Sequence, residues 1–163
     1  MSPTSFLLVW STLALALLLT VLHLPADAPT LLGWLRPDWA AIVVLYWVMA
    51  IPQQVGMVTA WVAGILVDSL TGNLLGQHAL GLVFIAWAGL TLHERLRMYS
   101  KVQQALIVLI TVALAQLIGA AIENLSRGVP FSFLALLPAF TSALVWPPLF
   151  LALRALRRRF GVA

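Results

Sequence analysis

The stretch WAAIVVLYWVMAIPQQVGMVTAWVAGILV, residues 39–67, decides how this chain folds. It contains no charged residue, and it is too long for one comfortable helix across a bilayer, which takes ~20 residues. Near its middle lie Pro52-Gln53-Gln54 and Gly56, which break helices and leave backbone groups in need of hydrogen bonds. We therefore predict two helices here, joined by a turn.

The composition of the whole chain also indicates a membrane protein. Of its 163 residues, 63% are apolar and 9% are charged, and the mean hydropathy is +1.04. A soluble domain is about 25% charged because charge covers its surface, so a water-soluble fold is not expected. We predict a single integral membrane domain over residues 1–163. The net charge of +4 is explained by membrane topology, and no nucleic-acid partner is expected.

Charged residues divide the chain into long uncharged stretches, each long enough to span a bilayer. With residues 39–67 divided at the turn, they predict an all-α polytopic membrane protein with about six transmembrane helices. The third and fourth helices are short for a hydrocarbon core of ~30 Å, so they either extend into the turns or are sheltered by neighbours. Pro147-Pro148 must kink or break the sixth. The predicted helices cover residues 5–24, 31–51, 55–71, 78–93, 102–122 and 134–153.

The basic residues predict an orientation. In a six-span chain, seven of the nine Lys and Arg residues lie on one face, either between the fourth and fifth helices or in the tail. Because basic segments stay on the cytoplasmic side, we predict that both termini are cytoplasmic. A five-span chain with an uncharged outer N-terminus remains the alternative topology. Residues 1–28 lack the basic start of a signal peptide and have a longer apolar run, so we expect a retained helix.

Motifs for catalysis or cofactor binding do not appear in the sequence. There is no cysteine, no G-x-S-x-G elbow, no Walker loop and no dinucleotide-binding glycine pattern. His93-Glu94 begins like the zinc motif H-E-x-x-H, but Arg97 occupies the position of the second histidine. His23 and His78 have no partner at ligand spacing and are expected at the membrane interface. We expect no enzyme activity and no catalytic, metal-binding or cofactor-binding residue.

A carboxylate and two glycines mark the end of the third predicted helix. Asp68 would be costly on a lipid-facing surface, so we expect it to face protein or water. Its expected hydrogen-bond donors are Ser69, Thr71 or the amides of the following turn. Gly72 and Gly76 are expected to supply positive φ in that turn.

Polar and small residues near other helices predict local structure. Arg36, Pro37 and Asp38 are expected to start the main apolar part of the second helix, with a local ion pair. Gln116 lies at mid-membrane and is expected to hydrogen-bond to a neighbouring helix. Ala60-x-x-x-Gly64 predicts close packing of helix three, because small residues let helix backbones approach.

Several segments also point to a known family. They are RPDW (36–39), YW (46–47), AIPQQVGMVTAW (50–61), GILVDSLTGNLLGQHAL (64–80), QQALIV (103–108), WPPLFLALR (146–154) and the arginine-rich end. In this order they resemble the rod shape-determining protein MreD family of Gram-negative bacteria, and the resemblance covers nearly the whole chain. Its most specific part is the four-residue spacing of Gly64, Asp68, Gly72 and Gly76.

The resemblance implies a non-enzymatic inner-membrane subunit of the cell-elongation machinery that builds lateral peptidoglycan. Members of the family associate with MreC, and through it with MreB, RodA and the transpeptidase partner of RodA. The family is also similar in fold to the substrate-binding subunits of energy-coupling-factor vitamin transporters. Some relatives carry a basic residue in the turn where this chain has Gln53-Gln54, so that turn is not among the expected contacts.

Two functions follow as alternatives. The first is a scaffold whose outer face binds MreC, while its basic face serves topology and contacts anionic membrane lipids. The second is a membrane subunit that binds a small molecule or lipid precursor, which requires a cavity with several polar groups. Gln116 is nearly alone at mid-depth, so the scaffold is the main prediction. The candidate partner-binding or structural residues are Arg36, Pro37, Asp38, Gly64, Asp68, Gly72, Gly76 and Glu123.

Overall fold

The computed structural model describes residues 3–22 and 33–161, and those ranges contain helices and turns but no β-strand. The all-α prediction is therefore confirmed. Residues 23–32, on which His23 and the predicted ends of the first two helices fall, lie outside the described ranges. The helices are α1 (Pro3–Val21), α3 (Trp39–Ala50), α4 (Met57–Thr71), α5 (Gln77–Met98), α6 (Lys101–Arg127), the 3-10 helix η1 (Phe133–Leu136) and α7 (Leu137–Arg159).

The helices differ in length. In the described part of the chain, α5, α6 and α7 are long and apolar enough to cross a membrane. The shorter apolar helices are α1, α3 and α4. With 12 residues, α3 is ~18 Å long and does not cover a ~30 Å hydrocarbon core. The long helices agree with a membrane protein, whereas the crossing of the bilayer by all six α-helices stays a prediction.

The short helix α3 lies at the centre of the molecule. Every residue from Ala40 to Met49 is buried, and α3 contacts α1, α4, α5, α6 and α7. A helix that is apolar on all sides is stable only when other elements cover all sides. The predicted continuous helix over residues 31–51 is wrong, because residues 35–38 are not helical. The side chain of Asp38 caps α3 instead, accepting a hydrogen bond from the Ala41 amide at 3.0 Å.

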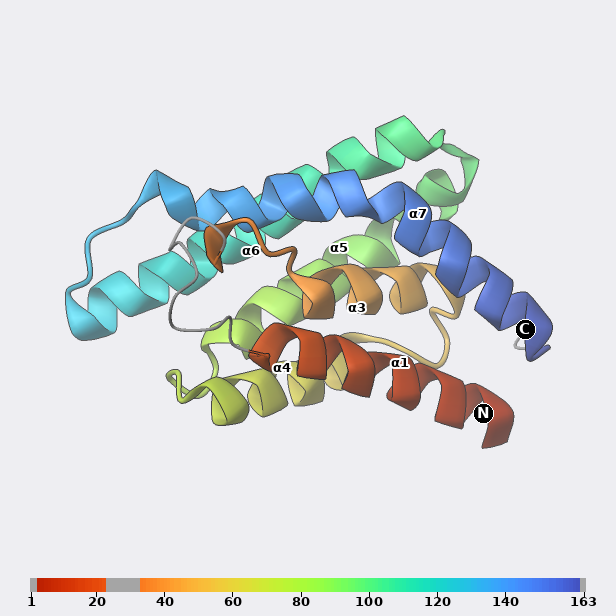
Figure 1. Ribbon diagram of the computed structural model, residues 1–163, viewed down its shortest axis with the longest axis horizontal. Coiled ribbons are helices and arrows are strands. Elements are labelled where there is room, and N and C mark those ends of the chain that lie inside the picture. Colours follow the sequence, from red (N-terminus) through yellow and green to blue (C-terminus); the bar gives the residue numbers. More distant parts are fainter. Residues whose placement is uncertain (1–2, 23–32, 162–163) are drawn as a thin grey trace.

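Successive α-helices run in opposite directions along the molecule (Figure 1). The predicted break at Pro52–Gly56 is confirmed as the turn between α3 and α4. This turn lies at the same end of the molecule as the α5–α6 turn, the amino end of α1 and the carboxyl end of α7. We call this end of the molecule the basic end, because it carries Arg97, Lys101, Arg154 and Arg157. The α4–α5 turn and the α6–α7 connection lie at the opposite end, called the outer end (Figure 1).

The long helices extend beyond the predicted boundaries. α5 continues past His93 to Met98, and only two residues separate it from α6, which begins after a capping box formed by Ser100 and Gln103. Charged residues end an apolar stretch without ending a helix. The hydropathy pattern therefore placed the carboxyl ends of α5, α6 and α7 too early. Pro147-Pro148 does not break α7, whose axis bends along its length (Figure 1).

Candidate functional site

The carboxylate of Asp68 joins α4 to the start of α5. It is fully buried, and its Oδ2 accepts a hydrogen bond from the Gly76 amide at 2.8 Å. Its Oδ1 accepts one from the His78 amide at 2.9 Å and lies 2.8 Å from His78 Nδ1. A negative charge at the amino end of a helix is favourable because the first amides there have no helical partner. Asp68 therefore acts as a cap that comes from the neighbouring helix.

The two glycines of the α4–α5 turn have the conformation that the sequence predicted. Gly72 ends α4 at φ +68°, and Gly76 precedes α5 at φ +104°, both in the left-handed region that favours glycine. The predicted amide donors to Asp68 are confirmed, but the predicted hydroxyl donors are wrong. Ser69 and Thr71 donate instead to carbonyls one turn earlier in α4.

Gly64 allows α4 and α5 to approach closely. A Cβ atom at this position would lie 2.2 Å from the Cα of Ala79, which is less than any real contact distance. Ala60, one turn earlier on the same face, is fully buried. The predicted packing face is thus confirmed. The residues spaced four apart from Gly64 to Gly76 together shape a helix hairpin. Gly64 allows the close contact between the helices, Asp68 is the buried cap, and Gly72 and Gly76 are the two left-handed residues of the turn.

Arg36 and Asp38 connect the start of α3 to two other helices. The guanidinium of Arg36 donates to the carbonyl of Leu19 in α1. The Asp38 amide donates to Ser142 Oγ in α7 at 2.9 Å, and Ser142 is fully buried. The predicted ion pair between Arg36 and Asp38 is wrong, because each side chain has a backbone partner. The prediction that a helix starts here is confirmed, with Pro37 just outside it.

A cavity of about 350 Å³ lies beside these residues at the outer end, and we call it the outer cavity. Side chains from α5 and α6 and from the segment before α3 line it, together with Pro138 of α7. Of the eight predicted candidates, Arg36, Pro37, Asp38 and Glu123 line the outer cavity, whereas the four residues from Gly64 to Gly76 shape the adjacent hairpin. The polar lining consists of Thr20, Arg36, Asp38, Gln77, His78, Gln116 and Glu123.

Two amide oxygens in this lining have no hydrogen-bond partner among the residues that the structure describes. They are Oε1 of Gln77 and Oε1 of Gln116, both buried from solvent. The predicted hydrogen bond from Gln116 to a neighbouring helix is therefore wrong for this oxygen. Buried acceptors are nearly always paired in proteins, so two of them in one cavity indicate a place where a donor group or water binds.

Sequence reasoning missed the contribution of His78 and Gln77. His78 was expected to be an isolated interfacial residue, but its ring contacts Asp68 and its side chain is 37% exposed beside the outer cavity. The signal was present as a carboxylate ten residues before a histidine, across a turn with two glycines. Recognising it required knowing that this turn folds α5 back onto α4.

The family model described as rod shape-determining protein MreD matches residues 4–156. The chain belongs to the MreD family. The rod shape-determining protein MreD of Haemophilus influenzae is 35% identical to it over 157 residues, which cover 96% of each chain. No solved structure matches the chain.

Membership in the MreD family confirms the resemblance that the ordered segments indicated. The matched region contains the α4–α5 hairpin, the start of α3 and the whole lining of the outer cavity. The family is described by its effect on rod shape, and the fold is that of an all-helical membrane protein with long apolar helices. The chain is thus a rod shape-determining membrane protein by family.

Proposed function

We propose that this chain is a non-enzymatic, multi-pass subunit of the bacterial inner membrane that binds MreC and helps to organise lateral peptidoglycan synthesis. The observation that carries the proposal is the family match over residues 4–156. MreB, RodA and the transpeptidase partner of RodA belong to the same assembly in this proposal. Both termini, and with them the basic end, face the cytoplasm.

The end of α6 and the connection from it to α7 supply a contact surface for MreC. Leu125 is 86% exposed and Phe133 is 83% exposed, and Val129 and Phe131 are also exposed. The rings of Phe131 and Phe133 lie edge to face with centroids 5.4 Å apart. We call these four residues the outer loop surface. Exposed, clustered aromatic side chains are typical of sites where a partner buries apolar area.

The charged residues predicted as MreC contacts are less suitable probes. Asp68 is fully buried, and Arg36 and Asp38 make hydrogen bonds inside the protein. Reversing the charge of these residues would change the fold together with any contact. The outer loop surface avoids this difficulty, because its side chains are exposed.

The proposal predicts that the double variant Phe131→Ser, Phe133→Ser loses MreC. We expect co-purification from membranes in mild detergent to fall at least about tenfold, because two aromatic anchors are removed from the interface. The control is Arg158→Gln with Arg159→Gln, which removes two exposed cations from the opposite end. Loss of MreC in the arginine variant with full retention in the phenylalanine variant would move the interface to the cytoplasmic tail.

A second candidate function is the binding of a small polar molecule or the headgroup of a lipid precursor in the outer cavity. It is favoured by the two unpaired amide oxygens beside Arg36, Asp38 and Glu123. A volume of about 350 Å³ lies within the range of small-molecule sites. These groups offer hydrogen-bond acceptors and both signs of charge, so they suit a ligand rich in N–H or O–H donors.

Filling the cavity tests this second function. Gly119 lines it, and a Cβ atom there would meet only the Gln77 side chain, at 3.8 Å. Gly119→Leu should therefore occupy ligand space and abolish rod-shape complementation while MreC co-purification persists. Gly119→Ala, which adds one methyl group at ordinary contact distance, should complement normally. Normal cell shape with Gly119→Leu would rule out a required ligand and leave the scaffold function standing.

A further inference from the structure

A second cavity, of about 470 Å³, lies at the basic end, and we call it the basic cavity. Four cationic side chains line it, and they come from α5, α6 and α7. None of its described lining residues carries a carboxylate. Within the described ranges, the one contact within 4.0 Å between a carboxylate and a basic side chain is that of Asp68 with His78, at the outer end. The full lining is Tyr46, Met49, Ala50, Arg97, Lys101, Phe150, Arg154 and Arg157.

Two of these cationic side chains donate hydrogen bonds to carbonyls at the carboxyl end of α3. Arg97 donates hydrogen bonds to the Met49 carbonyl at 2.9 and 3.2 Å and to the Ala50 carbonyl at 3.1 Å. Arg157 donates to the same Ala50 carbonyl at 3.1 Å. The carboxyl end of a helix carries the equivalent of about half a negative charge. Four full positive charges exceed that by far, so the basic cavity keeps a large excess of positive charge.

Several donors in the basic cavity remain available. Nε of Arg157 is buried and has no hydrogen-bond partner in the described part of the chain. Arg154 is exposed, and it forms no hydrogen bond or ion pair with any residue in the described ranges. Lys101 Nζ lies 3.5 Å from the centroid of the Phe150 ring and donates to Gln104 Oε1 at 3.2 Å, which leaves two of its three protons.

We propose that the basic cavity binds a phosphate group, namely the headgroup phosphate of an anionic membrane lipid. Guanidinium groups bind phosphate through paired N–H donors, and Arg154 and Arg157 lie one helical turn apart. A bound phosphate would pair the orphaned Nε of Arg157 and reduce the repulsion among four cations. Free phosphate offers the same oxygens, so the two sources must be separated by experiment.

The position of the cavity favours a lipid over an acidic protein segment. Its cations lie where α5 ends, where α6 begins and in the last turns of α7, at one end of the three long apolar helices. Headgroup phosphates lie at this level of a bilayer, next to the ends of spanning helices. Tyr46 and Phe150 add aromatic surface that suits the glycerol region of a lipid. A soluble acidic peptide has no part that needs such surface.

The test uses the purified full chain in a neutral detergent. Binding of phosphatidylglycerol, phosphatidylcholine and inorganic phosphate is measured by native mass spectrometry and by the rise in thermal unfolding temperature. Lys101→Gln with Arg154→Gln should weaken phosphatidylglycerol binding about tenfold, because two cations leave the site. The control, Arg158→Gln with Arg159→Gln, removes the same charge outside the cavity and should change binding by less than about twofold. Phosphatidylcholine should bind weakly to all three proteins.

The phosphate arm separates the two sources. Phosphatidylglycerol binding that millimolar inorganic phosphate does not displace identifies the lipid, whereas displacement identifies a site for free phosphate and overturns the assignment to lipid. Equal loss in both double variants would mean diffuse attraction and would overturn the proposal. The proposal would also be overturned if the protein bound a glutamate-rich peptide instead of lipid and the cavity variant lost that binding. If the cavity variant unfolds, Arg154→Gln alone replaces it, since Arg154 forms no hydrogen bond with the residues that the structure describes.

Discussion

Asp68 is the residue at which burial, charge and backbone geometry meet. Its carboxylate is fully buried and accepts hydrogen bonds from amides at the start of α5. Asp68→Leu leaves those partly buried amides without their partner, so we expect the free energy of unfolding to fall by about 2 kcal/mol. Thermal unfolding in detergent measures the loss. The control is Ser69→Ala, which removes an exposed hydroxyl; equal unfolding temperatures for the two variants would refute the structural role.

Single residues also show what the sequence could and could not reveal at the site. The sequence could predict the conformations of Gly72 and Gly76 and the amide partners of Asp68, because they depend on residues close together in the sequence, in and beside the α4–α5 turn. It could not predict the contact of His78 with Asp68 or the place of Gln116 in the outer cavity. Those positions are set by how whole helices pack, and hydropathy along the chain contains no information on that packing.

The helix pair α4–α5 depends on one missing side chain. Gly64→Ala places a Cβ atom 2.2 Å from the Cα of Ala79, so the two backbones must separate. We expect a lower yield of folded protein and a lower unfolding temperature. Gly119→Ala is the matched control, because alanine favours helix by about 1 kcal/mol over glycine at both positions, but only Gly64 lies against backbone. Gly64→Ala as stable as Gly119→Ala would show that the close approach is unnecessary.

The elements that sequence reasoning placed well are those with local signals. The turn at Pro52–Gly56 follows from residues that break helices, and its position is correct. The start of α3 was placed too early, since apolar residues before Arg36 resemble the continuation of a span. Asp38 caps the helix, so α3 begins only at Trp39. An apolar run therefore indicates where a chain avoids water, while capping residues indicate where a helix begins.

At the scale of the whole molecule, the alternating helices predict an orientation that cysteine labelling can measure. The sequence has no cysteine, so one introduced cysteine gives one label. Gln53 and Ser132 are both exposed and lie in turns at opposite ends (Figure 1). Ser132→Cys should react with an impermeant maleimide from the periplasm, and Gln53→Cys only after the membrane is opened, because the basic end faces the cytoplasm.

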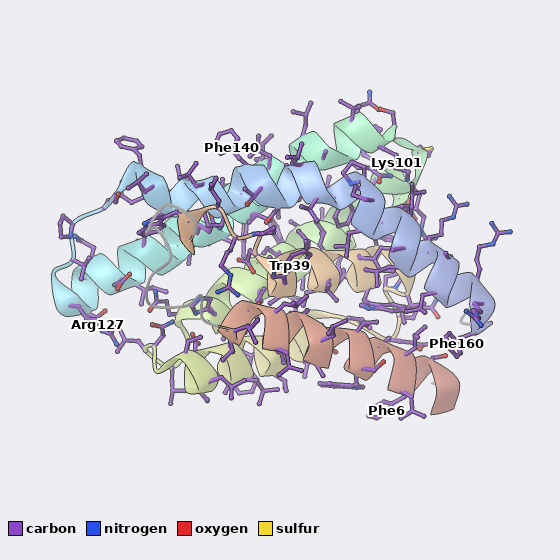
Figure 2. All side chains as sticks on the ribbon, viewed as in Figure 1. Phe6, Trp39, Lys101, Arg127, Phe140 and Phe160 are labelled. Carbon is purple, nitrogen blue, oxygen red and sulfur yellow. The ribbon has the colours of Figure 1, made fainter. Side chains whose placement is uncertain are left out.

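The orientation has a second, independent readout. Alkaline phosphatase fused after Ala163 should be inactive, since the enzyme requires the periplasm. Figure 2 shows Lys101 and Phe160 in one half of the molecule and Arg127 at the opposite extreme, consistent with two separate ends. Labelling of Gln53→Cys in intact cells, or an active fusion, would contradict the six-span arrangement with both termini in the cytoplasm.

The complete enclosure of α3 has a consequence for how the protein is made. The ribosome delivers α3 before α5 and α7, yet these later helices contact it. A segment of 12 residues has too little length to rest across a bilayer by itself. During synthesis, α3 must therefore stay in a temporary position, at the translocon or against α1, until the helices that pack on it have been made. Biogenesis of this protein is a process that finishes only with the last helix.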